Sequence, residues 1–238
     1  ALYRAKGTGR GRSETYRPEL EQELRRSYMA VIRPGENKVV QLGAEDAERI
    51  TLVDEGNADY VLGVSNKGYR TESQWTGRSK QNAYIISTLD GRRATVFNGE
   101  LGFAQASPKG KYISWYNQVQ KQYFVYNVQT GATKNVSSKI KVPLFDTEND
   151  VPDYPSAAGT TGWTANDQYF LVNDEYDIWQ VDPDGNGDPK NITNGFGRKN
   201  KISFNYMRFD PEKRFMDADE TIVLNSFNKD SKYEGYFT

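Results

Sequence analysis

Short runs of aromatic and β-branched residues alternate with turns rich in Gly, Pro, Asn and Asp along most of this chain. The clearest example begins with the turn Ser107-Pro108-Lys109-Gly110, where Pro presets the backbone of the second turn position and Gly tolerates a positive φ. Residues 111–116 and 123–128 follow as two aromatic runs, and residues 133–137 close the unit. Runs of this composition and length, bounded by such turns, predict antiparallel β-strands.

The same order of turn and strands recurs on both sides of this unit. A later copy has strand-like runs at residues 168–172, 176–181 and 190–193, and an earlier copy has them at 60–64, 83–86 and 94–97. Partial copies lie at residues 27–42 and 204–237. A repeat of about four short strands is typical of β-propeller blades. We therefore predict an all-β fold over residues 26–238, a partial β-propeller of about four to five four-stranded blades.

Three segments do not fit this repeat. Residues 66–80 and 139–158 are polar insertions, and long loops of compact domains commonly carry function. Residues 1–25 show no apolar periodicity, so we predict an irregular basic N-terminal segment with a short helix over residues 18–26. The partial copies predict a truncated propeller with open edges. Such edges favour self-association, either between chains or through pairing of the two partial blades of one chain.

The composition removes most catalytic mechanisms. The 238 residues include neither His nor Cys, so no Ser-His-Asp or Cys-His relay, imidazole metal ligand, disulfide or zinc-thiolate site can form from them. No Gly-x-Ser-x-Gly nucleophile motif occurs either. A formal net charge of −1 favours neither nucleic acid nor an anionic membrane as a partner, and no apolar run is long enough to span a bilayer. We expect no catalytic residue, metal or cofactor in this chain.

The second insertion is a candidate binding region. It carries Asp146, Glu148 and Asp150 close to Tyr154, and this negative charge suits a substrate ammonium group. The alternative is a solvated acidic connection, because loops are commonly polar.

A second candidate region follows the closing run of the later copy. Arg198, Lys199 and Asn200 lie there, and a guanidinium can grip a carboxylate or a carbonyl group of a substrate. The alternative is an ordinary charged surface.

The turn at residues 182–188 resembles the opening of a calcium loop, with oxygen-bearing side chains at Asp182, Asp184 and Asn186. Thr193 stands at the twelfth position, where a bidentate Glu is expected. The other copies have a hairpin turn at this place, so we expect a turn that binds calcium no tighter than about millimolar. The sequons at Asn135 and Asn191 occupy equivalent places in two copies, and we attribute them to the repeat rather than to glycosylation.

Two strings of residues carry a family resemblance. The first, from Ser107 through Tyr126-Asn127-Val128 to Ser137, resembles the blade signature of the propellers in prolyl oligopeptidases, dipeptidyl peptidase IV relatives and TolB-type proteins. The second, from Gly162-Trp163-Thr164 through Tyr176-Asp177-Ile178-Trp179 to Gly197-Arg198-Lys199-Asn200, is similar to the propeller of secreted bacterial serine peptidases of the prolyl oligopeptidase family. The resemblance covers about residues 26–238.

In that family the propeller caps an α/β-hydrolase domain that holds the catalytic Ser, Asp and His, and it screens access to them. The resemblance therefore implies a non-catalytic domain, in a periplasmic or secreted protein, that gates and orients peptide substrates for a serine peptidase domain not present in this chain. Some relatives bind the substrate amino terminus with a Glu-Glu pair, and this sequence has no such pair.

Two other functions are compatible with the repeat. A free-standing TolB-like propeller would act as a binding scaffold for a protein partner or a cell-wall component. A propeller glycosidase would need two carboxylates on the innermost strands, and residues 101–106 and 159–163 offer none. These residues alone do not decide whether the chain belongs to an enzyme.

Overall fold

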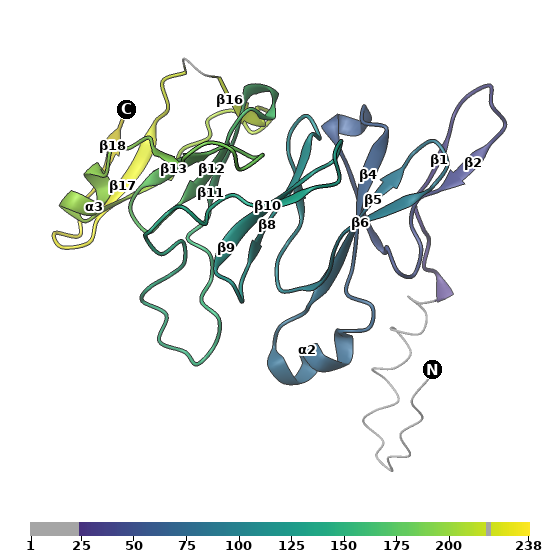
Figure 1. Cartoon of the computed structure of the whole chain (residues 1–238), viewed down its shortest axis with the longest axis horizontal. Helices are drawn as coiled ribbons and strands as arrows, with labels where there is room; N and C mark the ends of the chain where they lie inside the picture. Colours follow the sequence, from purple (N-terminus) through teal and green to yellow (C-terminus); the bar gives the residue numbers. More distant parts are fainter. Residues whose placement is uncertain (1–23, 218–219) are drawn as a thin grey trace, which may run out of the picture.

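The computed structural model describes residues 24–217 and 220–238, which form five sheets that follow one another in chain order (Figure 1). Each sheet corresponds to one propeller blade, and we number the blades 1 to 5 from the N-terminal side. The all-β, partial-propeller fold expected from the sequence is confirmed. The segment predicted over residues 1–25 lies outside the described residues, apart from Leu24 and Arg25.

The strands of each blade have the following bounds. Blade 1 is the hairpin of β1 (Ala30–Ile32) and β2 (Val39–Gln41). Blade 2 contains β3 (Arg49–Leu52), β4 (Tyr60–Ser65), β5 (Gln81–Ser87) and β6 (Arg93–Glu100). Blade 3 contains β7 (Gln105–Ala106), β8 (Tyr112–Asn117), β9 (Gln122–Asn127) and β10 (Thr133–Asn135). Blade 4 contains β11 (Thr160–Thr164), β12 (Phe170–Asn173), β13 (Ile178–Val181) and β14 (Lys190–Asn191). Blade 5 contains β15 (Ile202–Tyr206), β17 (Leu224–Asn228) and β18 (Glu234–Phe237).

Several elements were not expected from the sequence. The first insertion contains the helix α2 (Arg70–Thr76), and α3 (Phe196–Asn200) precedes blade 5. The strand β16 (Phe215–Met216) lies within the connection between β15 and β17. It pairs in parallel with β11 of blade 4 and not with the strands of blade 5. Two 3₁₀ turns, η1 (Asp54–Gly56) and η2 (Ala165–Asp167), follow β3 and β11. Within the described ranges, no helix combines the length and the apolar surface needed to cross a membrane.

The strand β8 explains how neighbouring blades hold together. All six of its residues are buried, because both faces of blade 3 are covered. Ile113 and Trp115 belong to the core shared with blade 2, and Tyr112 and Tyr116 belong to the core shared with blade 4. An aromatic run without polar alternation is therefore what a strand between two blades requires.

A buried carboxylate ties blade 3 to blade 4. Asp167, at the end of η2, is only 1% exposed. Its side chain accepts hydrogen bonds from Ser107 Oγ at 2.6 Å, from the backbone N of Lys109 at 3.0 Å and from the backbone N of Lys111 at 3.1 Å. Because these hydrogen bonds compensate the burial of the Asp167 side chain, they hold the turn before β8 in blade 3 against η2 of blade 4.

The calcium-like turn of residues 182–188 also has a structural use. Asp182 accepts hydrogen bonds from the backbone N of Asp184 and of Gly187, both at 2.9 Å. Asp184 accepts hydrogen bonds from Tyr112 Oη at 2.9 Å and Asn127 Nδ2 at 2.8 Å, both in blade 3. Among the described residues, no group of three or more His, Cys, Asp or Glu side chains is arranged to hold a metal ion. The turn thus joins two blades.

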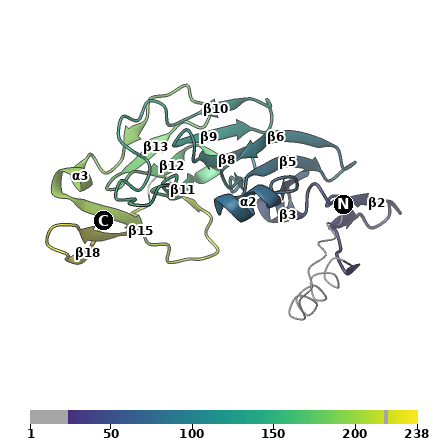
Figure 2. The same cartoon turned by 90° about the horizontal axis from the view of Figure 1, so that it is seen from below.

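Among the described residues, the two partial blades do not pair with each other, which was one of the alternatives that the sequence left open. The hairpin of β1 and β2 lies at one end of the molecule and β18 lies at the other, in both the first view and the view from below (Figures 1 and 2). The three blades between them keep the ends apart.

Candidate functional site

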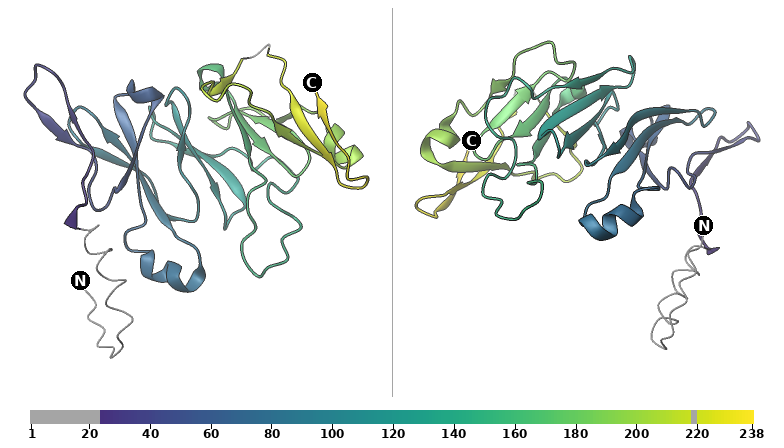
Figure 3. Two further views of the ribbon diagram at one scale, coloured as in Figure 1. Left: turned by 180° about the vertical axis from the view of Figure 1, so that it is seen from behind. Right: turned by 60° about the horizontal axis from the view of Figure 1, so that its bottom comes forward.

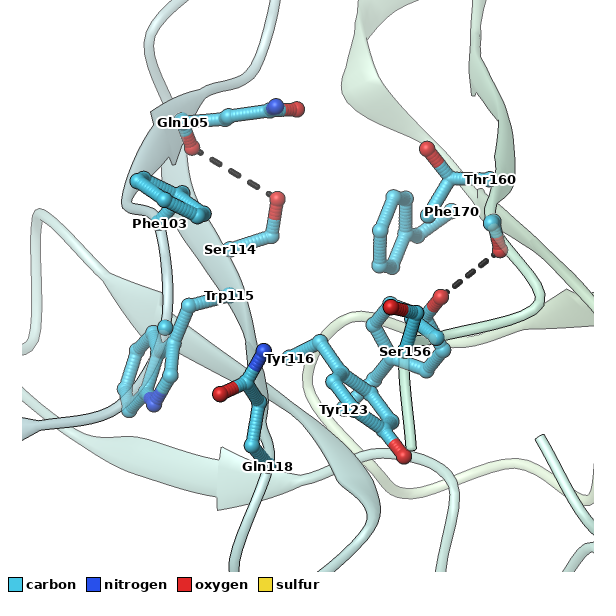
Figure 4. Close-up of a pocket in the computed structure, with 13 residues that line it drawn as sticks. Phe103, Gln105, Ser114, Trp115, Tyr116, Gln118, Tyr123, Ser156, Thr160 and Phe170 are labelled. Atoms are coloured by element: carbon cyan, nitrogen blue, oxygen red, sulfur yellow. Dashed lines mark hydrogen bonds between the residues drawn. The ribbon is translucent and has the colours of Figure 1, made fainter. Parts of the chain in front are cut away.

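A pocket of about 300 Å³ lies where blades 3 and 4 meet (Figure 4). Its walls come from β8, β9 and β12, from the start of β11 and from the loop before β7. Aromatic rings dominate the lining, namely those of Phe103, Trp115, Tyr116, Tyr123 and Phe170. A concave site of this size, with aromatic walls and a few polar groups, is typical of binding sites for small ligands or single side chains.

Two tyrosines of the pocket differ in their hydrogen bonding. Tyr123 Oη donates to the carbonyl oxygen of Gly159 at 2.7 Å, and burial raises the pKa of its hydroxyl (Figure 4). Burial raises the pKa of Tyr116 to about 12, so this hydroxyl is also protonated at neutral pH. Within the part of the chain that the structure describes, neither Tyr116 Oη nor Trp115 Nε1 has a hydrogen-bond partner, although both atoms are buried. Both polar atoms are thus enclosed by the cores on the two faces of blade 3, Trp115 toward blade 2 and Tyr116 toward blade 4.

The wall of the pocket requires a glycine at position 102. A Cβ atom at Gly102 would lie 2.4 Å from the carbonyl oxygen of Tyr116 and 3.3 Å from Trp115 Cδ1. The loop before β7 approaches the backbone of β8 this closely only because no side chain intervenes.

The two insertions meet beside this pocket through Arg78. Its Nε lies 2.5 Å from Asp153 Oδ1, and its other nitrogens donate to the carbonyl oxygen of Tyr154 and to Gln118 Oε1. The guanidinium carbon also lies 5.5 Å from the centre of the Tyr154 ring. Since Gln118 lines the pocket, we call Arg78, Gln118, Asp153 and Tyr154 the insertion clamp. Both α2 and the loop of residues 139–158 project on the same side of the blades (Figures 1 and 3).

The acidic residues expected to bind a substrate ammonium group do not converge on one point. Asp146 Oδ1 accepts a hydrogen bond from the backbone N of Glu148 at 2.9 Å. Glu148 pairs with Lys229 of blade 5 at 3.1 Å, whereas Tyr154 belongs to the insertion clamp on the other side of the loop. Among the described residues, the Asp150 side chain forms neither a hydrogen bond nor an ion pair. A role of these four residues in substrate binding stays a prediction.

Arg198 of α3 and Lys229, which pairs with Glu148, both approach the aromatic ring of Tyr176. Arg198 lies 5.1 Å and Lys229 lies 5.4 Å from the centre of this ring. Arg198 Nη2 also donates to the buried carboxylate of Asp174 at 3.0 Å. The side chain of Arg198 is thus held by Asp174 and Tyr176, which lie in the turn between β12 and β13 of blade 4.

The other two candidate residues of α3 are peripheral. Lys199 is exposed, and Asn200 Nδ2 donates to the carbonyl oxygen of Phe196 at 2.8 Å. Substrate contact by Arg198, Lys199 and Asn200 therefore stays a prediction, as it does for the acidic residues.

Our sequence reasoning missed the residues that build the pocket. Tyr116 and Tyr123 were assigned only to strands, and Arg78 was seen only as part of a polar insertion. The repeat could have indicated this pocket, because consecutive propeller blades pack face to face and their aromatic strands therefore meet at each interface.

Comparisons with known proteins concern the fold. Neither a protein-family model nor a curated protein sequence matches this chain. Among solved structures, a TolB from Agrobacterium tumefaciens is 12% identical with a TM-score of 0.41, over 85% of this chain and 70% of that chain. The dipeptidyl peptidase 4 of Porphyromonas gingivalis is 9% identical with a TM-score of 0.36, over 89% of this chain and 32% of that chain. The tricorn protease is 11% identical with a TM-score of 0.35, over 89% of this chain and 20% of that chain.

The sheet topology defines the class of this chain. Blades 2 and 3 are four-stranded antiparallel sheets whose strands pair in sequence order, and blade 4 has the same order with β16 added at its inner edge. Blades 1 and 5 have two and three strands of the same arrangement. The described residues therefore form a β-propeller domain.

Proposed function

We propose that this chain is the propeller part of a serine peptidase of the prolyl oligopeptidase type. In this proposal it admits and orients peptides for a hydrolase domain that is not among these residues, in a periplasmic or secreted protein. The observation that carries the proposal is the pocket between blades 3 and 4. Its aromatic walls suit peptide side chains.

The position of the insertion clamp supports the same proposal. Arg78 holds two segments far apart in the sequence beside the pocket, with Trp75 of α2 86% exposed and Phe103 of the pocket rim 66% exposed. Loops that are held in place around an aromatic pocket restrict which ligands reach it. Selection of extended peptides over folded proteins is the role that this arrangement serves.

The test is a calorimetric titration of the purified chain with an acetylated alanine-proline tetrapeptide amide. We expect saturable binding that weakens about tenfold in Phe103→Ala, because the exposed ring at the pocket rim packs against the bound peptide. In the unbound protein the same substitution removes an exposed ring, so the melting temperature should stay about equal. Loss of affinity without loss of stability separates a binding role from a structural one.

Tyr233→Ala serves as a matched control, because Tyr233 is an aromatic residue that is 78% exposed on blade 5. It should leave the affinity unchanged. No saturable binding, or equal affinity in Phe103→Ala, contradicts the proposal. Binding of a folded partner protein without binding of the peptide would favour the alternative, a TolB-like scaffold. In either case we expect no hydrolysis of the peptide amide, since the chain has no His and no nucleophile motif.

A further inference from the structure

A second cavity, of about 460 Å³, is lined by residues of the inner strands and by Asp54 of η1. The strand β16, close in sequence to the arginines of this cavity, lies on the side of the blades opposite α2 (Figure 1). Three blades contribute to it through β3, β7 and β11. Its lining includes Thr51, Ser107 and Thr161. The hydroxyls of Ser107 and Thr161 donate to Asp167 and Asn173, so they are already used within the fold. Two arginines from the connection between β15 and β17, Arg208 and Arg214, complete it.

The strand β16 determines where these arginines lie. Phe215 pairs with Trp163 and Met216 pairs with Thr164, so the connection is held along the inner edge of blade 4. Met216 is 4% exposed and packs in the core between blades 4 and 5. Arg214 directly precedes Phe215 and Met216 in sequence, so their pairing with β11 places its backbone beside the cavity that its side chain lines.

The positive charge of the cavity is not balanced by nearby carboxylates. Asp54 pairs with Lys109 at 3.2 Å. Arg214 Nε lies 3.8 Å from Glu55 Oε1, which is longer than a hydrogen bond. Arg208 has no ion pair or hydrogen bond to any residue in the described ranges. The cavity therefore contains one guanidinium without a partner and a second with a weak one.

The backbone of the inner strands adds hydrogen-bonding capacity. Within the described residues, β3 pairs only with β4 and β7 pairs only with β8. The other edge of each strand leaves N–H and C=O groups unpaired, as edge strands do. At blade 4 this edge is already occupied by an extended segment of the chain itself, namely β16. The inner edges are thus able to accept an extended backbone.

We propose that this cavity is a carboxylate-binding site, with Arg208 and Arg214 as the groups that hold the anion. The planar guanidinium matches a carboxylate through paired N–H donors. The carboxylate belongs either to the free C-terminal end of a peptide or to a small organic acid. The site adjoins the pocket between blades 3 and 4, with which it shares Gln105, Thr160 and Phe170, but Arg208 and Arg214 line the second cavity alone. It does not depend on the function proposed above.

The test compares ligands that differ only in the anion. The intact chain is titrated with acetyl-trialanine as the free acid, with the same peptide as the amide, and with succinate. We expect saturable binding of at least one acid with a dissociation constant of about 1 mM or tighter, and no binding of the amide at this site. Binding of the peptide acid alone assigns the site to peptide ends, and binding of succinate alone assigns it to small acids.

Variants connect the binding to the cavity. Arg208→Ala should weaken acid binding at least about tenfold, and Arg208→Lys should weaken it less, because the charge remains but the paired donors are lost. Arg92→Ala is the matched control, since Arg92 lies in the turn after β5 with 89% of its side chain exposed. Thermal melting verifies that each variant is folded. Equal binding of acid and amide, no saturable binding of either acid, or unchanged affinity in a folded Arg208→Ala would each overturn the proposal.

Discussion

Glu100 lies at the end of β6, and its carboxyl group is partly buried. This carboxyl group accepts a hydrogen bond from Asn117 Nδ2. Burial raises the pKa of this carboxyl above its usual value. A group with a raised pKa binds its proton more tightly in the folded state, so its contribution to stability is present at acid pH. That contribution is lost as the pH rises through the folded-state pKa.

We predict that Glu100→Gln stabilises the chain at pH 8 and has little effect at pH 4. The amide keeps a carbonyl oxygen for Asn117 and removes the charge that burial disfavours. The gain should be less than about 1 kcal/mol, because solvent reaches the carboxyl and screens its charge. Urea unfolding of both proteins at the two pH values measures the effect. A larger stabilisation at pH 4 than at pH 8 would contradict this explanation.

Gly197 is required by close backbone packing at α3. A Cβ atom there would lie 2.5 Å from the carbonyl oxygen of Tyr176 and 2.7 Å from that of Ile202. Its backbone N also donates to the buried carboxylate of Asp177 at 3.0 Å. The packing thus gives a physical reason for a glycine in the string that resembles the peptidase propellers.

We predict that Gly197→Ala destabilises the chain by about 1–3 kcal/mol, because backbone atoms would have to move apart. Gly235→Ala is the control, since its Cβ would meet Ser226 Oγ at an ordinary 3.5 Å. It should change stability by less than about 0.5 kcal/mol. Chemical denaturation decides, and equal effects of the two substitutions would show that packing at Gly197 is not limiting.

At the scale of elements, the insertion clamp should order two loops without adding much global stability. We predict that Arg78→Ala accelerates hydrogen exchange of backbone amides in residues 146–156, with little change in melting temperature, because exposed ion pairs contribute little. Lys80→Ala is the control, as Lys80 pairs only with Glu72 of the same insertion among the contacts found in the described residues. Unchanged exchange in Arg78→Ala would mean that the loops hold their positions independently.

The same clamp has a defined pH dependence. The hydrogen bond from Arg78 lowers the pKa of Asp153 below its usual value. A lowered carboxyl pKa contributes stability that is present above the unfolded-state pKa and is lost as the pH falls through the folded-state value. The clamp should therefore persist at neutral pH and open only in acid.

The elements differ in how well the sequence predicted them. The strands around Tyr60, Tyr112 and Tyr123 were found because aromatic and β-branched runs alternate with Gly and Pro turns. The helix α2 was missed, since Arg70–Thr76 has no apolar periodicity and none of its residues is buried. The strand β16 was missed because two residues carry no strand signal, and its partner β11 lies far away in the sequence.

The pocket was harder to predict than the fold. Its lining runs from Gly102 to Phe170 and depends on how blades 3 and 4 pack, which local patterns do not specify. Arg78 and Asp153 meet across 75 positions of the sequence. Charge density alone directed attention to the acidic loop, whereas Glu148 and Asp153 are paired with cations of other elements.

At the scale of the whole molecule, the two ends differ in character. The outward positions of the blade 1 hairpin include Ile32 and Val39, which are cross-strand neighbours with 65% and 62% exposure. The exposed positions of blade 5 include the aromatic residues Tyr233 and Tyr236, which are 78% and 71% exposed, beside the polar Asn205 and Asn225. The exposed surface at blade 1 is thus aliphatic, and that at blade 5 is a mixture of aromatic and polar side chains.

We predict that the chain associates at about 100 µM through blade 1. Association would pair the open strand edge of this hairpin and bury its exposed aliphatic side chains. Ile32→Lys should yield monomers, whereas Val119→Lys, at a position 54% exposed in the turn between β8 and β9 of blade 3, should not. Light scattering over a concentration series gives the answer. A wild-type chain that stays monomeric throughout, or that associates equally after Ile32→Lys, would contradict this prediction.

We propose that the propeller domain binds peptides where blades 3 and 4 meet. The most direct measurement is hydrogen exchange of the chain with and without the acetylated tetrapeptide amide, followed by mass spectrometry. The account predicts slower exchange upon binding in residues 101–105, 114–123 and 156–170, which surround the pocket. Unchanged exchange in all three segments at a saturating peptide concentration, or protection confined to blades 1 and 5, would contradict it.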